Sequence, residues 1–304
     1  MNSIKDIAKS VAQRLKNHAK REGRTFEELS IYYGMERFLY RLSQSKHANM
    51  FILKGAVMLR VWNSQDPRAT RDIDLLGKTS NDPESIIGKI LEILSTEVEP
   101  DGIIFDPDSI QYEPITEGAN YTGIRIRFLS KIDTAKVPML IDIGFGDVVS
   151  PHPTKEDYPT LLEFPAPNIL CYSRESSIAE KVEAVIKLGS INSRMKDFYD
   201  IWMLSRQFNF DEKTLTKAIH ATLGHRKTAI PNTIEAFSED FAETKQKDWT
   251  AFCNNLKLEK RIAPKSFSEV IAVIRAFIGP LLVEPSLSNK KSKSITWVAP
   301  SGWR

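Results

Sequence analysis

The sequence predicts an α+β protein, with a mixed β-sheet core between N-terminal helices and a C-terminal helical domain. Apolar residues recur at helical spacing near the N-terminus. Residues 124–128 alternate between apolar and basic side chains, which is the period of a half-buried strand. Helical spacing returns after a proline-rich run at 150–167. The expected parts are a helical segment at 1–48, a core at 49–165, a helical domain at 166–285 and a tail at 286–304.

Composition restricts the protein class. The 304 residues are 41% hydrophobic and 27% charged, which is ordinary globular usage and argues against disorder. A net charge of +3 is too small to indicate nucleic-acid binding by itself. The two cysteines form no CxxC pair, so we expect neither a zinc site nor a disulfide framework, and a reducing cytoplasm fits best. The most apolar stretch, 270–283, is interrupted and too short to span a membrane, so we expect no membrane association.

Two helices are expected before the core. The first carries an apolar stripe from Ile4 and ends near Gly23. The second begins at Thr25, with Glu28 three positions later as a capping box, and continues to Leu42.

The core elements follow from apolar runs and turn signals. An apolar strand at 51–53 stops at Lys54-Gly55 and is followed by a helix at 56–62. A strand at 71–76 and an amphipathic helix at 83–97 come next. The alternating strand 124–128 is expected to pair antiparallel with 137–145 across a short polar loop.

The C-terminal half is expected to be helical. Ser177 and Glu180 predict a capping box, and Gly189 predicts the end of that helix. A second helix is expected from about Ser193, and the remaining ones at 215–223, 234–253 and 267–278. The tail from Ser286 lacks an apolar pattern before Trp297, so it is expected to be mobile.

Three acidic residues form the candidate chemical centre. Asp72 and Asp74 lie two apart on a predicted strand and therefore project from one face. Two adjacent carboxylates repel each other unless a divalent cation compensates, and hard oxygen ligands suit Mg²⁺. Asp142, flanked by Ile141 and Ile143, also faces away from the apolar side of its strand. The alternative is that Asp72 and Asp74 are ordinary solvent-face residues, and for an isolated DxD pattern that alternative is the more common one.

Gly55 adds a second feature to this centre. It follows an apolar strand and precedes a predicted helix, where bare backbone N–H groups and a positive helix end can hold phosphate. A tight turn is the alternative. Gly144 and Gly146 follow Asp142 and leave room for a nucleotide, or they mark a bend at the strand end.

Several segments together resemble a known family. They are KGA (54–56), RATRDIDLL (68–76), IDIGFGD (141–147), IAEKVEAVIKLG (178–189) and NSRMKDFYD (192–200). In this order they resemble the AbiEii/AbiGii nucleotidyltransferase toxins of bacterial abortive-infection and toxin–antitoxin systems, which belong to the DNA polymerase β-like superfamily. The resemblance covers roughly residues 40–223. It implies a nucleotidyltransferase-type sheet core.

The resemblance also implies residue roles. Asp72, Asp74 and Asp142 would hold Mg²⁺, with Asp142 orienting or deprotonating the attacking hydroxyl. Lys181 and Asp197 are the further catalytic candidates. The nucleotide-binding candidates are Gly55, Ala56, Thr70, Lys181, Lys196 and Asp200. Ala56 stands where the superfamily pattern has a second Gly or a Ser, so the turn offers main-chain groups alone.

Several of these candidates have ordinary alternative interpretations. Lys181 can be a solvated helix residue, Asp197 and Asp200 can act as helix-dipole partners, and Lys196 and Asp200 have the i,i+4 spacing of a helix pair. Thr70 stands where some relatives are silenced by phosphorylation, although a β-branched strand residue is the simpler interpretation.

The implied function is that of a Mg²⁺-dependent toxin that transfers a nucleoside monophosphate from an NTP to RNA and so inhibits translation and growth. The tRNA 3′ end is the preferred acceptor. GTP and CTP or UTP are both consistent with the family as donors. An antitoxin, AbiEi-like or of another kind, is the implied partner.

Charge runs are usually solvated faces, but ten basic residues are candidates for a track that binds RNA: Arg21, Arg24, Arg37, Arg41, Arg125, Arg127, Arg194, Lys196, Arg226 and Lys227.

Two other functions stay open. The protein can be a non-catalytic nucleotide- or RNA-binding module, or a metal-dependent nuclease.

Overall fold

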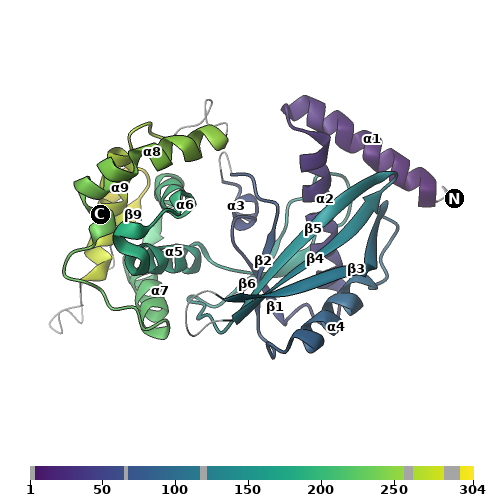
Figure 1. Cartoon of the computed structure of the whole chain (residues 1–304), viewed down its shortest axis with the longest axis horizontal. Helices are drawn as coiled ribbons and strands as arrows, with labels where there is room; N and C mark the ends of the chain where they lie inside the picture. The colour runs from purple at the N-terminus through teal and green to yellow at the C-terminus, as the bar shows by residue number, and fades with distance from the viewer. Residues whose placement is uncertain (1–3, 65–67, 117–121, 257–262, 284–294) are drawn as a thin grey trace. The chain divides into compact units, whose positions relative to one another are not determined.

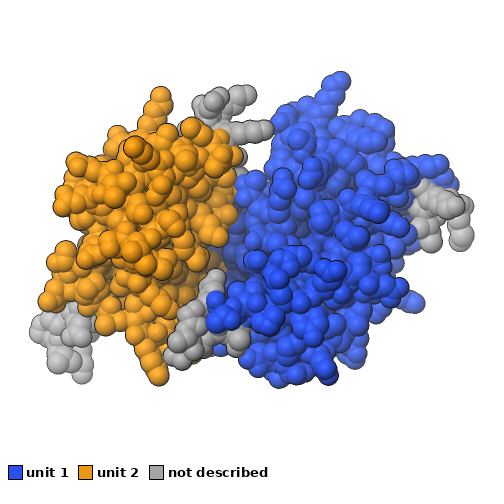
Figure 2. Space-filling view, viewed as in Figure 1, with its two compact units in different colours: residues 1–63, 69–146, 154–171 blue, residues 64–68, 147–153, 172–304 orange. Residues whose placement is uncertain are grey.

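A computed structural model describes residues 4–64, 68–116, 122–256, 263–283 and 295–304. It confirms the α+β class, with a mixed sheet preceded and followed by helices. The chain divides into two compact units (Figure 2). Unit 1 comprises residues 1–63, 69–146 and 154–171, and unit 2 comprises residues 64–68, 147–153 and 172–304. Across the described part of the chain, no helix combines the length and apolarity needed to cross a bilayer.

A seven-stranded sheet forms the centre of unit 1, in the order β3-β4-β5-β2-β1-β7-β6 (Figure 1). The strands are β1 Phe51–Lys54, β2 Ile73–Gly77, β3 Ile103–Thr116, β4 Thr122–Ile132, β5 Ala135–Phe145, β6 Thr154–Asp157 and β7 Asn168–Cys171. β2 pairs parallel with β5, and β7 pairs parallel with β1, whereas the other neighbours are antiparallel. The predicted antiparallel pairing of 124–128 with 137–145 is confirmed in β4 and β5.

Helices of unit 1 cover one face of this sheet. They are α1 Ile4–Glu22, α2 Phe26–Gln44 and α4 Pro83–Leu94, whereas the short α3, Met58–Val61, follows the turn after β1. α1 contacts β4, α2 contacts β5 and α4 contacts β3. Alternate residues of β5 from Val137 to Ile143 are buried beneath the helices, while those between them stay more exposed. The other face of β4 and β5 is therefore open, which leaves it available for a ligand.

Unit 2 is mainly helical. Its helices are α5 Arg174–Leu188, α6 Met195–Gln207, α7 Glu212–His225, α8 Glu239–Asn255 and α9 Phe267–Ile278. The rings of Phe198 and Trp249 both pack on Phe267, which joins α6, α8 and α9. Three short strands, β8 Phe210–Asp211, β9 Thr296–Val298 and β10 Gly302–Trp303, form a second sheet.

The expectation of a mobile tail is wrong for its last residues. Residues 284–294 lie outside the described part of the chain, but 296–303 contribute β9 and β10. Trp297 is buried against Phe277, and its indole N–H donates to the Ser205 carbonyl at 2.6 Å. The segment is also fixed by the pairing of β8 with β9 and by the Trp303 indole N–H, which donates to the Phe277 carbonyl at 3.0 Å.

The predicted helix starts are only partly correct. Thr25 caps α2 by accepting from the Glu28 N–H at 3.1 Å, and the Glu28 carboxylate accepts from Arg24 at 2.7 Å. The predicted start at Ser177 is wrong because α5 begins four residues earlier. Its cap is Ser173, which accepts from the Ser176 N–H at 3.1 Å. Both serines have the chemistry of a cap, and neighbouring contacts decide between them.

A fully buried ion pair lies inside α2. Glu36 and Arg37 are adjacent in the chain and both have exposed fractions of 0%, with 2.9 Å between their charged atoms. The second Glu36 oxygen accepts from the Leu161 N–H at 2.7 Å, and Arg37 donates to the Pro165 carbonyl at 2.8 Å. These bonds tie α2 to residues 161–165. Burial raises the pKa of Glu36 to about 7, although Arg37 acts in the opposite direction.

The stability of wild type relative to the Glu36→Gln variant should fall with rising pH. In the unfolded chain this carboxyl ionises near its ordinary value of 4.5, whereas in the folded chain it ionises at about 7. The folded state therefore holds the proton more tightly, and this contribution is lost as pH rises through about 7. We expect a relative loss of about 3 kcal/mol in the free energy of unfolding, measured by urea denaturation.

The exposed Glu97 supplies the control, because Glu97→Gln should follow wild type at every pH. Parallel pH profiles for Glu36→Gln and wild type would show that the buried pair does not titrate as expected.

Candidate metal and nucleotide site

Strand register places four charged residues in one row across the sheet. Lys54 of β1 is paired with Asp74 of β2, Asp74 with Asp142 of β5, and Asp142 with Arg125 of β4. Directly paired residues project from the same face of a sheet. The neighbours of Asp74 along its strand, Ile73 and Leu75, are fully buried on the opposite face.

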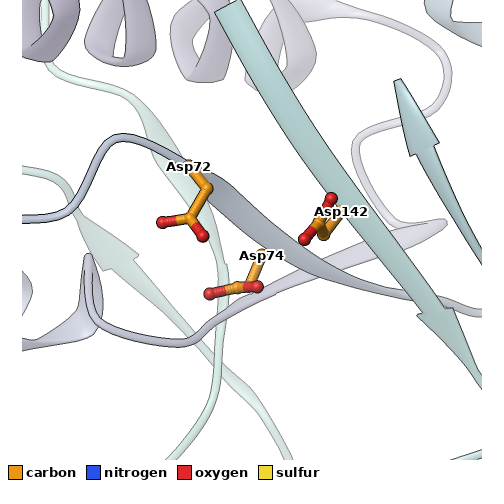
Figure 3. Close-up of side chains that lie close together, drawn as sticks. All are labelled: Asp72, Asp74 and Asp142. Carbon is orange, nitrogen blue, oxygen red and sulfur yellow. The ribbon is translucent and has the colours of Figure 1, made fainter. Parts of the chain in front are cut away.

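The carboxylates of Asp74 and Asp142 in this row lie close to a third carboxylate, that of Asp72 (Figure 3). Asp72 lies just before β2, and its carboxylate points toward those of Asp74 and Asp142. One oxygen atom from each of the three can be chosen so that all lie within 4.8 Å of one another. The residues are half-buried, so ligands can reach them. Three hard oxygen donors with open positions fit Mg²⁺ or a similar divalent cation.

Arg125 was expected only as part of a basic track, but it directly contacts this group. Its Nε donates to Asp142 Oδ1 at 2.8 Å, and its second nitrogen donates to Oδ2 at 2.6 Å. The hydrogen bond to Asp142, helped by the nearby Glu113 and Asp72 charges, raises the pKa of Arg125. A bidentate pair fixes the plane of a carboxylate, and each oxygen keeps a further lone pair for an ion.

Gly55 occupies a position that only glycine can fill. Its φ is +74°, in the left-handed region, and a Cβ atom there would overlap the Asp74 carboxylate. The turn is closed by the Met58 N–H donating to the Gly55 carbonyl at 3.2 Å. Because Gly55 has no side chain, the turn can pass close to the Asp74 carboxylate.

The helix after this turn is shorter than expected. The prediction was 56–62, whereas α3 covers four residues, Met58–Val61, and Asn63 has a positive φ of 52° just beyond it. A single turn has a small dipole, so any phosphate contact here would rest on the backbone N–H groups of Gly55 and Ala56.

Thr70 borders the carboxylates. Its hydroxyl donates a short hydrogen bond to Asp72 Oδ1, and its backbone N–H donates to the Tyr32 hydroxyl at 3.2 Å. The Tyr32 ring in turn lies 4.7 Å from the Arg24 guanidinium carbon and 4.6 Å from that of Arg60. Thr70 thus connects Asp72 to α2 and helps to fix the chain before β2.

The other predicted acidic residues belong to a buried charge cluster within unit 2. Lys181 Nζ lies 3.2 Å from Asp197 and 2.8 Å from Asp200. Arg68 binds both oxygens of Asp200 at 2.9 and 3.1 Å, and Arg194 binds Asp197 at 2.6 Å. Burial alone would raise the pKa of Asp200, but Arg68 and Lys181 outweigh it and lower this pKa to about 2.

This cluster changes how Lys181 and Lys196 are interpreted. Burial alone would lower the pKa of Lys181, but Asp200 and Asp197 outweigh it and raise this pKa. An ammonium group held by two carboxylates gains little from an added phosphate. Lys196 is exposed, and Asp200 pairs with Lys181 and Arg68 rather than completing the expected i,i+4 pair. Sequence reasoning missed Arg68, whose only signal was its place in the RATRDIDLL segment.

Several members of the expected basic track are paired with carboxylates. Arg37 is fully buried beside Glu36, and Arg41 forms a buried pair with Asp101 at 2.7 Å. Arg226 lies 2.8 Å from both Asp147 and Glu183. For Arg37 and Arg41 the track prediction is wrong, because both side chains are buried and paired with a carboxylate, whereas the Arg226 side chain keeps an exposed fraction of 25%.

Comparisons with known proteins agree with the sequence resemblance. The family model described as the nucleotidyl transferase AbiEii toxin of a type IV toxin–antitoxin system matches residues 37–273. No protein with a curated description matches the chain significantly.

Two crystal structures are similar in broad outline. A proposed nucleotidyltransferase from H. pylori is 14% identical with a TM-score of 0.46, and the match covers 85% of this chain and 97% of that one. JHP933 from Helicobacter pylori has the same identity and TM-score, covering 85% and 94%.

Replacing Gly55 by Ala should impair divalent-cation binding and lower stability. The added methyl group meets the Asp74 carboxylate and favours a negative φ, so we expect a loss of about 1–3 kcal/mol in the free energy of unfolding. Isothermal titration with Mn²⁺ should show weakened binding. Gly88→Ala is the matched control, because nothing lies within 4 Å of the added atom in α4. Equal Mn²⁺ affinity in wild type and Gly55→Ala would contradict the role of Gly55.

Asp200→Asn should destabilise the protein. It leaves Arg68 and Lys181 with one fewer buried counter-charge, and breaking such a network costs about 3–5 kcal/mol. Thermal unfolding should show a clear decrease in Tm. The exposed Asp240→Asn on α8 should leave Tm nearly unchanged. An unchanged Tm for Asp200→Asn would show that the cluster is not structural.

Proposed function

The chain belongs to the AbiEii nucleotidyl transferase toxin family, and on that premise we propose that it transfers a nucleoside monophosphate from an NTP to the 3′-hydroxyl of RNA, with tRNA as the preferred acceptor. The observation that supports this most is the meeting of Asp72, Asp74 and Asp142 on a half-exposed sheet face beside the Gly55 turn. A binding function alone would not need three mutually repelling carboxylates at one point.

The three carboxylates fit Mg²⁺, and we propose that Asp72 and Asp74 hold it together with the triphosphate, with Asp142 completing the ligand set. The bound ion would neutralise phosphate charge and lower the pKa of the attacking hydroxyl. Asp142 would accept the hydroxyl proton, since its carboxylate is fixed in orientation by Arg125. A bond forms between the RNA 3′ oxygen and the α-phosphorus, and the bond from that phosphorus to pyrophosphate breaks.

The other predicted residues receive more limited roles in this proposal. The backbone N–H groups of Gly55 and Ala56 would contact the triphosphate, and Thr70 would keep Asp72 in position through its hydroxyl. Lys181, Asp197 and Asp200 would act indirectly, by holding Arg68 four residues before Asp72 in the chain. Lys196, which is exposed, would contact nucleotide phosphate.

A toxin of a type IV toxin–antitoxin system implies an antitoxin partner, and we propose that growth inhibition depends on the transfer reaction. An AbiEi-like repressor or another antitoxin would then relieve toxicity. The assay described next identifies the preferred donor, which we expect to be GTP or a pyrimidine triphosphate.

Asp72→Asn and Asp74→Asn should each abolish transfer while the protein stays folded. The assay incubates purified protein with labelled NTPs, Mg²⁺ and total RNA, and measures label in RNA. We expect activity to fall by a factor of at least about 100, because each side chain serves the ion and not the core. Asp108→Asn, an exposed β3 residue, is the control and should keep full activity.

The same assay separates the alternatives. Shortened RNA in place of labelled RNA would indicate a metal-dependent nuclease. Unchanged RNA with tight NTP binding would indicate a non-catalytic module. Full transfer by both Asn variants would rule out the proposed ion site.

A further inference from the structure

The strand order places different strands on the two sides of the three carboxylates. β1, with Lys54 and the Gly55 turn, lies on one side of β2 and β5, and β4 lies on the other (Figure 1). In-line displacement at phosphorus places the nucleophile and the leaving group on opposite sides. If pyrophosphate leaves toward the Gly55 side, the attacking hydroxyl must approach from the side of β4. This step rests on the proposed function.

The face of β4 and β5 that extends from Asp142 is open. Beyond the Asp142–Arg125 pair, the same face carries Leu140 opposite Arg127, Pro138 opposite Leu129, and Lys136 opposite Lys131. Arg127, Leu129, Lys131, Lys136 and Pro138 are all exposed. The six residue steps from Asp142 to Lys136 span about 20 Å, the axial length of roughly six nucleotides of a stacked strand.

Two lysines face each other at the far end of this strip. Lys131 and Lys136 are paired directly across β4 and β5, one position from the Ile132–Ala135 pair that closes the hairpin. Like charges directly opposite each other reduce the stability of a sheet. Among the ion pairs of the described residues, neither lysine has a carboxylate partner. An anion that binds both would remove this repulsion.

Apart from Asp142, the acidic residues paired with β4 along this strip lie on β3. Glu113 binds Arg127 at 2.8 Å, and Asp106 is paired with Leu129 at the edge of the strip. The positive charge therefore lies along β4 and β5. The apolar pair Leu129 and Pro138 between the two ends offers a contact for sugars and bases that carries little sequence information.

We propose that the open face of β4 and β5, from Arg127 to Lys131 and Lys136, binds the single-stranded backbone of the RNA acceptor and leads its 3′ end to Asp142. The phosphates would contact these three cations, and the sugars and bases would lie over Leu129 and Pro138. Because the contacts are electrostatic and apolar, binding would be sensitive to salt and tolerant of sequence.

The test uses the double variant Lys131→Gln/Lys136→Gln in the full chain. Fluorescence anisotropy with a short 5′-labelled single-stranded RNA, which keeps its 3′-hydroxyl, should show weaker binding by roughly tenfold and a salt slope reduced by about 1.4 for two lost phosphate contacts. Lys9→Gln/Lys20→Gln on α1 removes two exposed lysines outside this face and should leave both quantities unchanged.

Transfer kinetics give a second readout. The KM for the RNA acceptor should rise in the double variant, whereas kcat at saturating RNA and the KM for NTP should stay near wild type. If wild type transfers no label at all, the proposed function fails, but anisotropy still decides whether RNA binds this face. Equal RNA affinity and equal salt slopes in wild type and Lys131→Gln/Lys136→Gln would overturn the inference.

Discussion

The candidate site depends on the register of four strands. Because side chains alternate along a strand, a slip of one residue between β2 and β5 would move Asp142 to the buried face and bring Ile141 or Ile143 out. Burial of those isoleucines prevents such a slip. Between β1 and β2, the close approach of Gly55 to Asp74 excludes any residue with a side chain at the turn. Core packing and a single glycine thus fix where the three carboxylates meet.

The two charge clusters differ in how accessible their carboxylates are. In unit 2, Asp197 and Asp200 are nearly inaccessible, and each has more than one cationic neighbour. In unit 1, Arg125 takes up the charge of Asp142, while the three carboxylates stay half-exposed. A compensated buried cluster stabilises a fold, whereas an accessible excess of negative charge attracts cations. On this contrast rests the proposal that Lys181 and Asp200 act indirectly, whereas Asp72 and Asp74 hold the ion.

Local patterns predicted much of unit 1. Alternation around Ile126 predicted the β4–β5 pairing, and the isoleucines beside Asp142 predicted which face its carboxylate occupies. Such local patterns could not predict contacts between segments that are distant in the sequence. Nothing near Arg125 shows that its partner lies 17 positions later, and both Ser173 and Ser177 have the chemistry of a cap, so the local pattern did not identify Ser173. Trp297 was misjudged because its partners lie in helices far earlier in the chain.

The repeated passage of the chain between the units limits how this protein can be divided. Residues 64–68 and 147–153 belong to unit 2, although the segments on either side of each belong to unit 1. A gene fragment ending at residue 171 would therefore keep Arg68 but lose Asp200, its bidentate partner. Neither unit can be cut out as one continuous piece, so recombination that exchanges whole modules between relatives would have to carry both units together.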